Sequence, residues 1–139
     1  MPPDLADFAG QWHLARRIED RREGRILDFS GQAVFTPEAH GLICRETGIL
    51  GGPGIRPMTA ARDWLWRADR GGIAVLFADG RPFHRFDPTV AAAEASHWCD
   101  PDAYRVTYDF TTWPDGWASL WRAQGPRKDY AMESRYSRR

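Results

Sequence analysis

The chain has 139 residues, of which 42% are hydrophobic and 27% are charged. This is enough apolar material for one core and too much for a disordered chain, so we expect a single domain over residues 1–139. The 19 Lys and Arg residues are balanced by 19 Asp and Glu residues, which gives no basic surplus for nucleic-acid binding, and no apolar run approaches the length of a membrane span. We therefore expect neither a nucleic acid nor a membrane as partner.

The first residues predict a short helical turn over residues 4–9, with Asp4 as its N-cap. They contain no basic region followed by an apolar stretch, so we expect no secretory signal and, by default, a cytoplasmic location. In that compartment Cys44 and Cys99 are expected to be free thiols.

From Trp12 onward, apolar residues recur with a period of two, which is typical of half-buried antiparallel strands. Turn sequences rich in Gly, Pro and Asp separate these runs, mostly at intervals of about 8–12 residues. Asp79-Gly80 favours a hairpin because Gly tolerates a positive φ, and residues 51–57 predict one longer loop. The alternating runs fall near residues 12–18, 27–35, 42–50, 73–77, 83–86, 104–110, 117–121 and 130–136.

Residues 90–95 are rich in Ala and could form either a short helix or a strand. We favour the strand, because small residues also suit crowded positions in a barrel. With it the chain has about ten strands, and closure into a barrel removes exposed sheet edges. The predicted fold is all-β: a single antiparallel up-and-down β-barrel of about 8–10 strands with a short N-terminal helical turn.

Gly10-Gln11-Trp12, at the start of the first strand, resembles the Gly-x-Trp signature of lipocalins and related calycin barrels. That resemblance implies that the Trp closes one end of the barrel, with an Arg near the last strand packed across its ring. The candidates for this Arg are Arg122, Arg127 and Arg135.

The expected lack of a secretory signal makes the chain similar to the intracellular fatty-acid-binding proteins and to the haem-carrying nitrobindin-like barrels. Residues 79–86 and 125–130 also resemble a small uncharacterised bacterial family, which supplies no activity.

Glu46 shares a strand face with Leu42, Cys44 and Leu50. If that face is interior, the carboxylate is buried and needs a partner, for which Arg62 and Arg122 are the candidates. The alternation equally allows Glu46 to face the solvent, since a shift of one residue reverses both faces.

The histidines have several possible roles. His84 could act in the cavity as an acid–base group, although a hydrogen-bonded structural histidine is the more common case. His97 and Cys99 share a face, and with His84 they could form a zinc site, but no metal-binding motif supports one and we expect none. A haem would need one axial histidine, with His97 the first candidate and His84 the second.

These patterns favour the binding of a small, largely apolar ligand, with an acidic head group as one option, in the barrel cavity. The sequence does not decide whether the protein is an enzyme, and the cofactor stays unknown. The alternatives are an isomerase or cyclase that uses His84 or His97, a haem or metal barrel, and an interior filled by Trp side chains. The expected ligand-binding residues are Glu46, Arg62, Trp66, His84, Phe86, Tyr108, Trp121 and Arg122.

Overall fold

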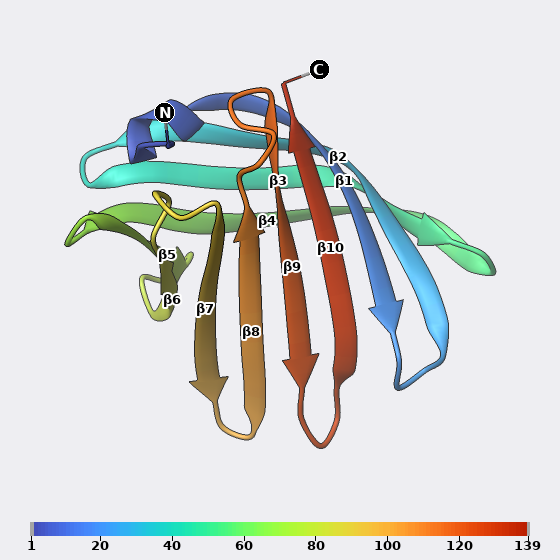
Figure 1. The fold of residues 1–139 in the computed structure, drawn as a ribbon. Coiled ribbons are helices and arrows are strands. Elements are labelled where there is room, and N and C mark those ends of the chain that lie inside the picture. Colours follow the sequence, from blue (N-terminus) through green and yellow to red (C-terminus); the bar gives the residue numbers. More distant parts are fainter. Residues whose placement is uncertain (1, 139) are drawn as a thin grey trace.

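The computed structural model describes residues 2–138, which form ten antiparallel strands around a nearly closed barrel (Figure 1). A 3-10 helix, η1 (Leu5–Phe8), precedes the first strand. The strands are β1 (Gly10–Asp20), β2 (Arg25–Glu38), β3 (Gly41–Gly52), β4 (Ile55–Asp69), β5 (Gly72–Phe77), β6 (Pro82–Phe86), β7 (Ala92–Cys99), β8 (Asp102–Asp109), β9 (Gly116–Gln124) and β10 (Asp129–Ser137). The expected all-β barrel with a short N-terminal helical turn is confirmed.

The strand order is β6-β5-β4-β3-β2-β1-β10-β9-β8-β7, so neighbours in the chain pair with each other and β1 pairs with β10. Within residues 2–138, no backbone ladder joins β6 to β7. Side chains fill this seam: His84 Nε2 lies 2.6 Å from Tyr108 Oη, and the Phe83 ring lies 5.2 Å from that of His97. The barrel is therefore closed by backbone everywhere except at one seam, which is closed by rings.

The N-terminal turn is capped as predicted. Asp4 accepts a hydrogen bond from the backbone N–H of Leu5 at 2.9 Å, and Asp7 accepts one from the backbone N–H of Asp4 at 2.9 Å. The cap fixes the start of the helix, and Phe8 at its other end is completely buried.

Trp12 closes the adjacent end of the barrel. Its Nε1 donates to the carbonyl of Phe8 at 2.9 Å, and Arg138 Cζ lies 3.5 Å from the centre of its ring. The arginine is thus Arg138, and the three candidates Arg122, Arg127 and Arg135 were wrong. The register explains this, because His13 pairs with Ser137, which brings Arg138, the residue after β10, to Trp12, whereas Arg135 lies opposite Ala15.

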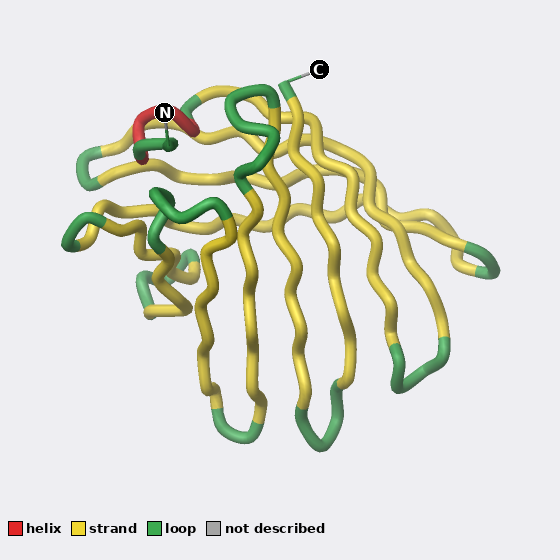
Figure 2. Tube along the Cα trace, in the orientation of Figure 1, coloured by secondary structure: helices red, strands yellow, loops and turns green. Residues whose placement is uncertain are grey.

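Two loop expectations have different outcomes (Figure 2). The Asp79-Gly80 hairpin joins β5 to β6, with Gly80 at φ +91°. The longer loop over 51–57 is wrong, because pairing continues to Gly52 and Ile55 and leaves only a two-residue turn. The strand over 90–95 is confirmed from Ala92, with residues 90 and 91 in the preceding turn.

Both cysteines are free, Cys44 in the core and Cys99 at the surface. Among residues 2–138 no helix is long and apolar enough to span a membrane.

Candidate ligand-binding site

Three layers of side chains line the inside of the barrel. The inward residues of β1 are Trp12, Leu14, Arg16 and Ile18, because alternate residues of a strand face the same side. Trp12 belongs to the plugged end, Arg16 to a polar centre, and Ile18 to the opposite end, where side chains are half-exposed. The interior therefore changes along β1 from an end plugged by Trp12, through a polar centre at Arg16, to an open end at Ile18.

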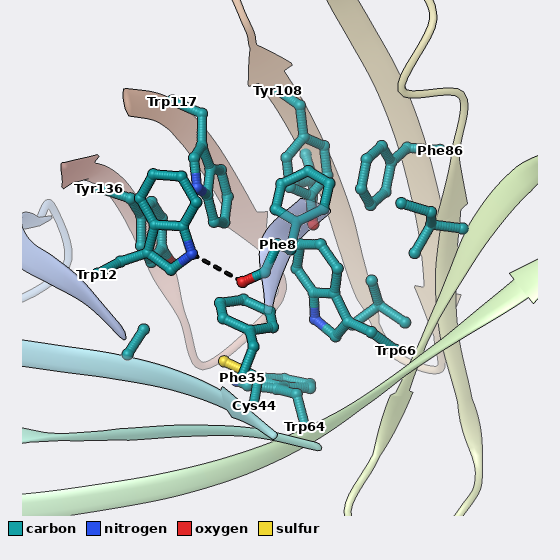
Figure 3. Close-up of a cluster of buried hydrophobic side chains, with 14 of the residues drawn as sticks. Phe8, Trp12, Phe35, Cys44, Trp64, Trp66, Phe86, Tyr108, Trp117 and Tyr136 are labelled. Atoms are coloured by element: carbon teal, nitrogen blue, oxygen red, sulfur yellow. Dashed lines mark hydrogen bonds between the residues drawn. The ribbon is translucent and has the colours of Figure 1, made fainter. Parts of the chain in front are cut away.

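An aromatic stack forms the wall next to the plug. Tyr136 and Trp117 lie parallel with ring centres 3.8 Å apart, and Tyr108 and Phe86 are stacked at 3.9 Å. Trp117 and Tyr108 are 6.2 Å apart, so the stack runs from β10 through β9 and β8 to β6 (Figure 3). The stack therefore spans the seam between β6 and β7 and forms one wall of the interior.

A buried ion pair forms the polar centre. Arg16 Nη1 and Nη2 donate to the two carboxylate oxygens of Glu46 at 3.0 and 2.9 Å. Arg16 Nε donates to Ser134 Oγ at 2.7 Å, and Tyr136 Oη donates to Glu46 at 3.0 Å. This bidentate ion pair compensates both charges inside the barrel.

Small residues of β2 make this contact possible. β2 lies between β1 and β3, and its inward residues between Arg16 and Glu46 are Gly31 and Ala33. Their small size lets the long Arg16 side chain reach across one strand.

The two partners predicted for Glu46 are therefore wrong. Arg62 lies opposite Glu46 in the register, but its guanidinium lies over the Trp64 ring at 4.3 Å. Arg122 is on the outer face of β9, with Nη1 2.6 Å from Asp129 Oδ1. The sequence contained the signal for Arg16, which continues the period-two row of Trp12 and Leu14.

Burial and charge change the pKa values in this centre. Burial disfavours the charged guanidinium of Arg16, but interactions with Tyr136 and Glu46 outweigh this and raise its pKa. Burial, and then the charge of Glu46, raise the pKa values of the Tyr136 hydroxyl and the Cys44 thiol. At neutral pH the centre holds a guanidinium–carboxylate pair with protonated neighbours.

A cavity lies beside this centre. Its volume is about 20 Å³, which is enough for a water molecule. Side chains fill the rest of the interior around this cavity, so a larger occupant needs some of them to move. The cavity is lined by Phe35, Cys44, Glu46, Trp64, Trp66, Val75, Tyr108, Trp117, Ser119, Trp121 and Tyr136.

His84 lies behind this cavity at the seam. Its Nε2 bonds with Tyr108, while its Nδ1 is buried and has no hydrogen-bond partner within the described residues. Burial, and then the charge of His97, lower the pKa of His84 to about 3, so the imidazole is neutral. His97 is half-exposed and packs edge-on against Phe83.

A zinc cluster of these residues does not form. Within residues 2–138, no group of three or more His, Cys, Asp and Glu side chains could hold a metal ion.

The structure brings together four of the eight expected ligand-binding residues at the cavity: Glu46, Trp66, Tyr108 and Trp121. His84 and Phe86 lie one layer behind, both against Tyr108. Arg62 is exposed beyond Trp64, and Arg122 is outside. Sequence reasoning missed Arg16, Ser119 and Ser134.

The sequence comparison identifies a family. A model of the family of unknown function DUF6314 matches residues 8–138. The chain belongs to this family. The match extends from Phe8 through the last strand of this DUF6314 protein, and it therefore covers the plug, the polar centre and the cavity. No curated protein matches the sequence.

Among solved structures, this DUF6314 barrel is similar to the S-type phycobiliprotein lyase CPES from Guillardia theta. The TM-score is 0.64 at 11% sequence identity, covering 97% of this chain and 90% of that chain. At this identity the likeness concerns the fold, and it fits the calycin-like barrel that Gly10-Gln11-Trp12 indicated.

Proposed function

We propose that this protein binds one small, largely apolar ligand through the open end of its barrel. The observation that carries the proposal is the central cavity, whose wall is mostly aromatic and includes a buried carboxylate. Such a combination, apolar surface with a few fixed polar groups, is what small-molecule sites have in common.

The two ends of the barrel differ in a way that favours entry from one side. Trp12 and Phe8 are fully buried at the plugged end. At the other end the inward side chains of Ile18, Trp121 and Met132 are half-exposed. Because the cavity itself holds about one water, we infer that Trp121 moves when a ligand enters and that the ligand lies between the mouth and Glu46.

The likeness to a phycobiliprotein lyase adds a bilin to the ligands that should be tested. It does so only as a candidate, because a bilin is far larger than the cavity. A smaller neutral aromatic compound, 1-naphthaleneacetamide, tests the proposed site with less rearrangement.

The indole N–H signals of the seven tryptophans provide the test, in ¹H–¹⁵N NMR titrations with 1-naphthaleneacetamide and with biliverdin. We expect saturable shifts at Trp64 and Trp121, which line the cavity, and none at Trp98, which is 63% exposed on the outside. Shifts at Trp98 equal to those at Trp121, or no saturable shift with either compound, would overturn the proposal.

Two substitutions at neighbouring positions of β9 distinguish binding inside the barrel from binding on its outer surface. Ser119→Phe fills the cavity and should abolish the shifts, whereas Leu120→Phe, at a 50% exposed outward position, should leave them unchanged. If Ser119→Phe does not fold, Trp121→Ala, at a half-exposed position, should weaken binding about tenfold through lost aromatic contact.

The hydrogen bond between His84 and Tyr108 favours acid–base catalysis as a second candidate function. Burial raises the pKa of Tyr108, so its hydroxyl stays protonated and could donate to a substrate in the cavity, with His84 Nε2 behind it. A ligand recovered chemically unchanged after long incubation with the protein would exclude this candidate. A product formed by the wild type but not by Tyr108→Phe would support it.

A further inference from the structure

A second hollow lies on the inner wall at the open end of the barrel, between the β1–β2 turn and the β9–β10 turn. Its volume is about 440 Å³, within the range of small-ligand sites. Figure 1 shows the two turns at the same end of the molecule. The hollow is lined by Ile18, Asp20, Arg22, Glu23, Arg25, Arg127, Lys128, Asp129, Tyr130 and Met132.

Hydrogen bonds hold the two turns together. Arg22 Nη1 donates to the carbonyl of Pro126 at 2.7 Å, and the backbone N–H of Arg21 donates to the carbonyl of Asp129 at 2.8 Å. The first bond places the Arg22 guanidinium beside the residue that precedes Arg127. Arg22 of the β1–β2 turn and Arg127 of the β9–β10 turn therefore both line the edge of the hollow, which we call the arginine rim.

Among the described residues, these two arginines form no ion pair, whereas most of the other charged side chains that line the hollow do. Asp20 pairs with Arg25 at 3.6 Å, and Asp129 pairs with Arg122 at 2.6 Å. Lys128 lies 3.3 Å from Asp102 and 3.0 Å from Tyr104 Oη. Within residues 2–138, neither Arg22 nor Arg127 forms an ion pair, and the only other unpaired charge lining the hollow is that of Glu23.

The floor of the hollow is apolar and leads to the central cavity. Ile18 and Met132 are opposite each other in the register of β1 and β10. Met132 is also opposite Trp121 of β9, which lines the cavity. An apolar body placed on Met132 would therefore have its polar end at the arginine rim.

We propose that Arg22 and Arg127 form a subsite for the carboxylate of the ligand, so that the ligand is an amphipathic organic acid. The inference rests on the proposed function and specifies the chemistry of its ligand. A guanidinium binds a carboxylate in a paired geometry, and Arg22 is already fixed by its bond to Pro126.

The test compares two compounds with the same body, 1-naphthaleneacetate and 1-naphthaleneacetamide, by isothermal titration calorimetry. We expect the acid to bind about tenfold more tightly than the amide, an advantage that salt reduces because the rim is exposed to solvent. Arg22→Gln and Arg127→Gln should each remove much of this preference without weakening the amide. Arg105→Gln, on the outer face and paired with Glu94, is the matched control and should change nothing.

The outcomes separate the two proposals. Equal affinity for acid and amide, or an unchanged preference in the Arg22→Gln/Arg127→Gln double variant, would overturn the carboxylate subsite and leave the binding function standing. Failure of both compounds to bind would overturn both the carboxylate subsite and the binding function. Tighter binding of the acid by Glu23→Gln would support the subsite, because it removes the one unpaired carboxylate from the rim.

Discussion

At the scale of single residues, the most consequential contact is that between Arg16 and Glu46. Their side chains are 12% and 7% exposed, so each charge depends on the other for compensation. Removing one partner of such a pair leaves an uncompensated charge in the interior. Among residues 2–138, Glu46 is also the one carboxylate on the cavity wall. The same contact is therefore involved in both the stability of the barrel and the recognition of a ligand.

We predict that Glu46→Leu lowers the free energy of unfolding by about 3 kcal/mol, because it leaves the Arg16 charge buried and unpaired. The double variant Arg16→Met/Glu46→Leu should recover at least half of the loss, since neither charge remains. Urea denaturation of the three proteins measures this. Equal losses in the single and double variants would show that the pair is not coupled as the geometry indicates.

His84 gives the folded protein a distinct pH dependence. Its pKa is about 3 when folded, below the ordinary value of 6.5 that the unfolded chain retains. Between these values the unfolded state binds more protons, so stability falls as the pH falls from 6.5 toward 3. Well above pH 6.5 the imidazole is neutral in both states and has no effect on the slope.

We predict that between pH 6.5 and 4.5 the wild type loses about 2 kcal/mol more of its unfolding free energy than His84→Leu does. Denaturation series at several pH values for both proteins test this. The carboxylates titrate in both proteins. The contribution of His84 is therefore the difference between the two plots of unfolding free energy against pH. Parallel slopes would mean that His84 titrates normally in the folded barrel.

At the scale of elements, β2 and β3 approach each other unusually closely at Gly31 and Gly48, which are opposite in the register. A Cβ at Gly31 would clash with the carbonyl oxygen of Thr47, and one at Gly48 would clash with the carbonyl oxygen of Ser30. Backbone atoms cannot yield as a flexible side chain can. The glycines therefore permit the close packing over which Arg16 reaches Glu46.

We predict that Gly31→Ala and Gly48→Ala each lower the free energy of unfolding by about 2 kcal/mol through overpacking. Gly51→Ala is the matched control on β3, because nothing lies within 4 Å of its Cβ position and its φ is not positive. Thermal and urea denaturation compare the three. A loss at Gly51 equal to that at Gly31 would contradict the close approach as the cause.

The elements also show what the sequence could and could not predict. The period-two rows predicted the strands that carry Trp12, Phe29 and Phe35, because alternation is a local property of each strand; the structure places all three side chains in the core. The partner of Glu46 could not be assigned, since it depends on how far β1 is offset from β3 across β2. The contact between Arg138 and Trp12 could not be assigned either, because it depends on the register of the first and last strands.

At the scale of the whole molecule, the barrel has one end filled by rings and one end lined by half-exposed apolar and charged side chains. The sequence indicated a barrel with many tryptophans but could not show how they share the interior. In the structure Phe8, Trp12 and Trp117 pack together at the plug, while Trp64 and Trp121 meet at 5.6 Å below the polar centre. The residual cavity is consequently small, and the open end is where a ligand has room.

Native mass spectrometry of the protein, purified gently from its own host beside the Ser119→Phe variant, tests the central claim most directly. We expect one stoichiometric extra mass on the wild type, released on unfolding and missing from the variant. An extra mass that persists in Ser119→Phe, or the same bare chain mass for both proteins, would contradict a ligand held in the barrel.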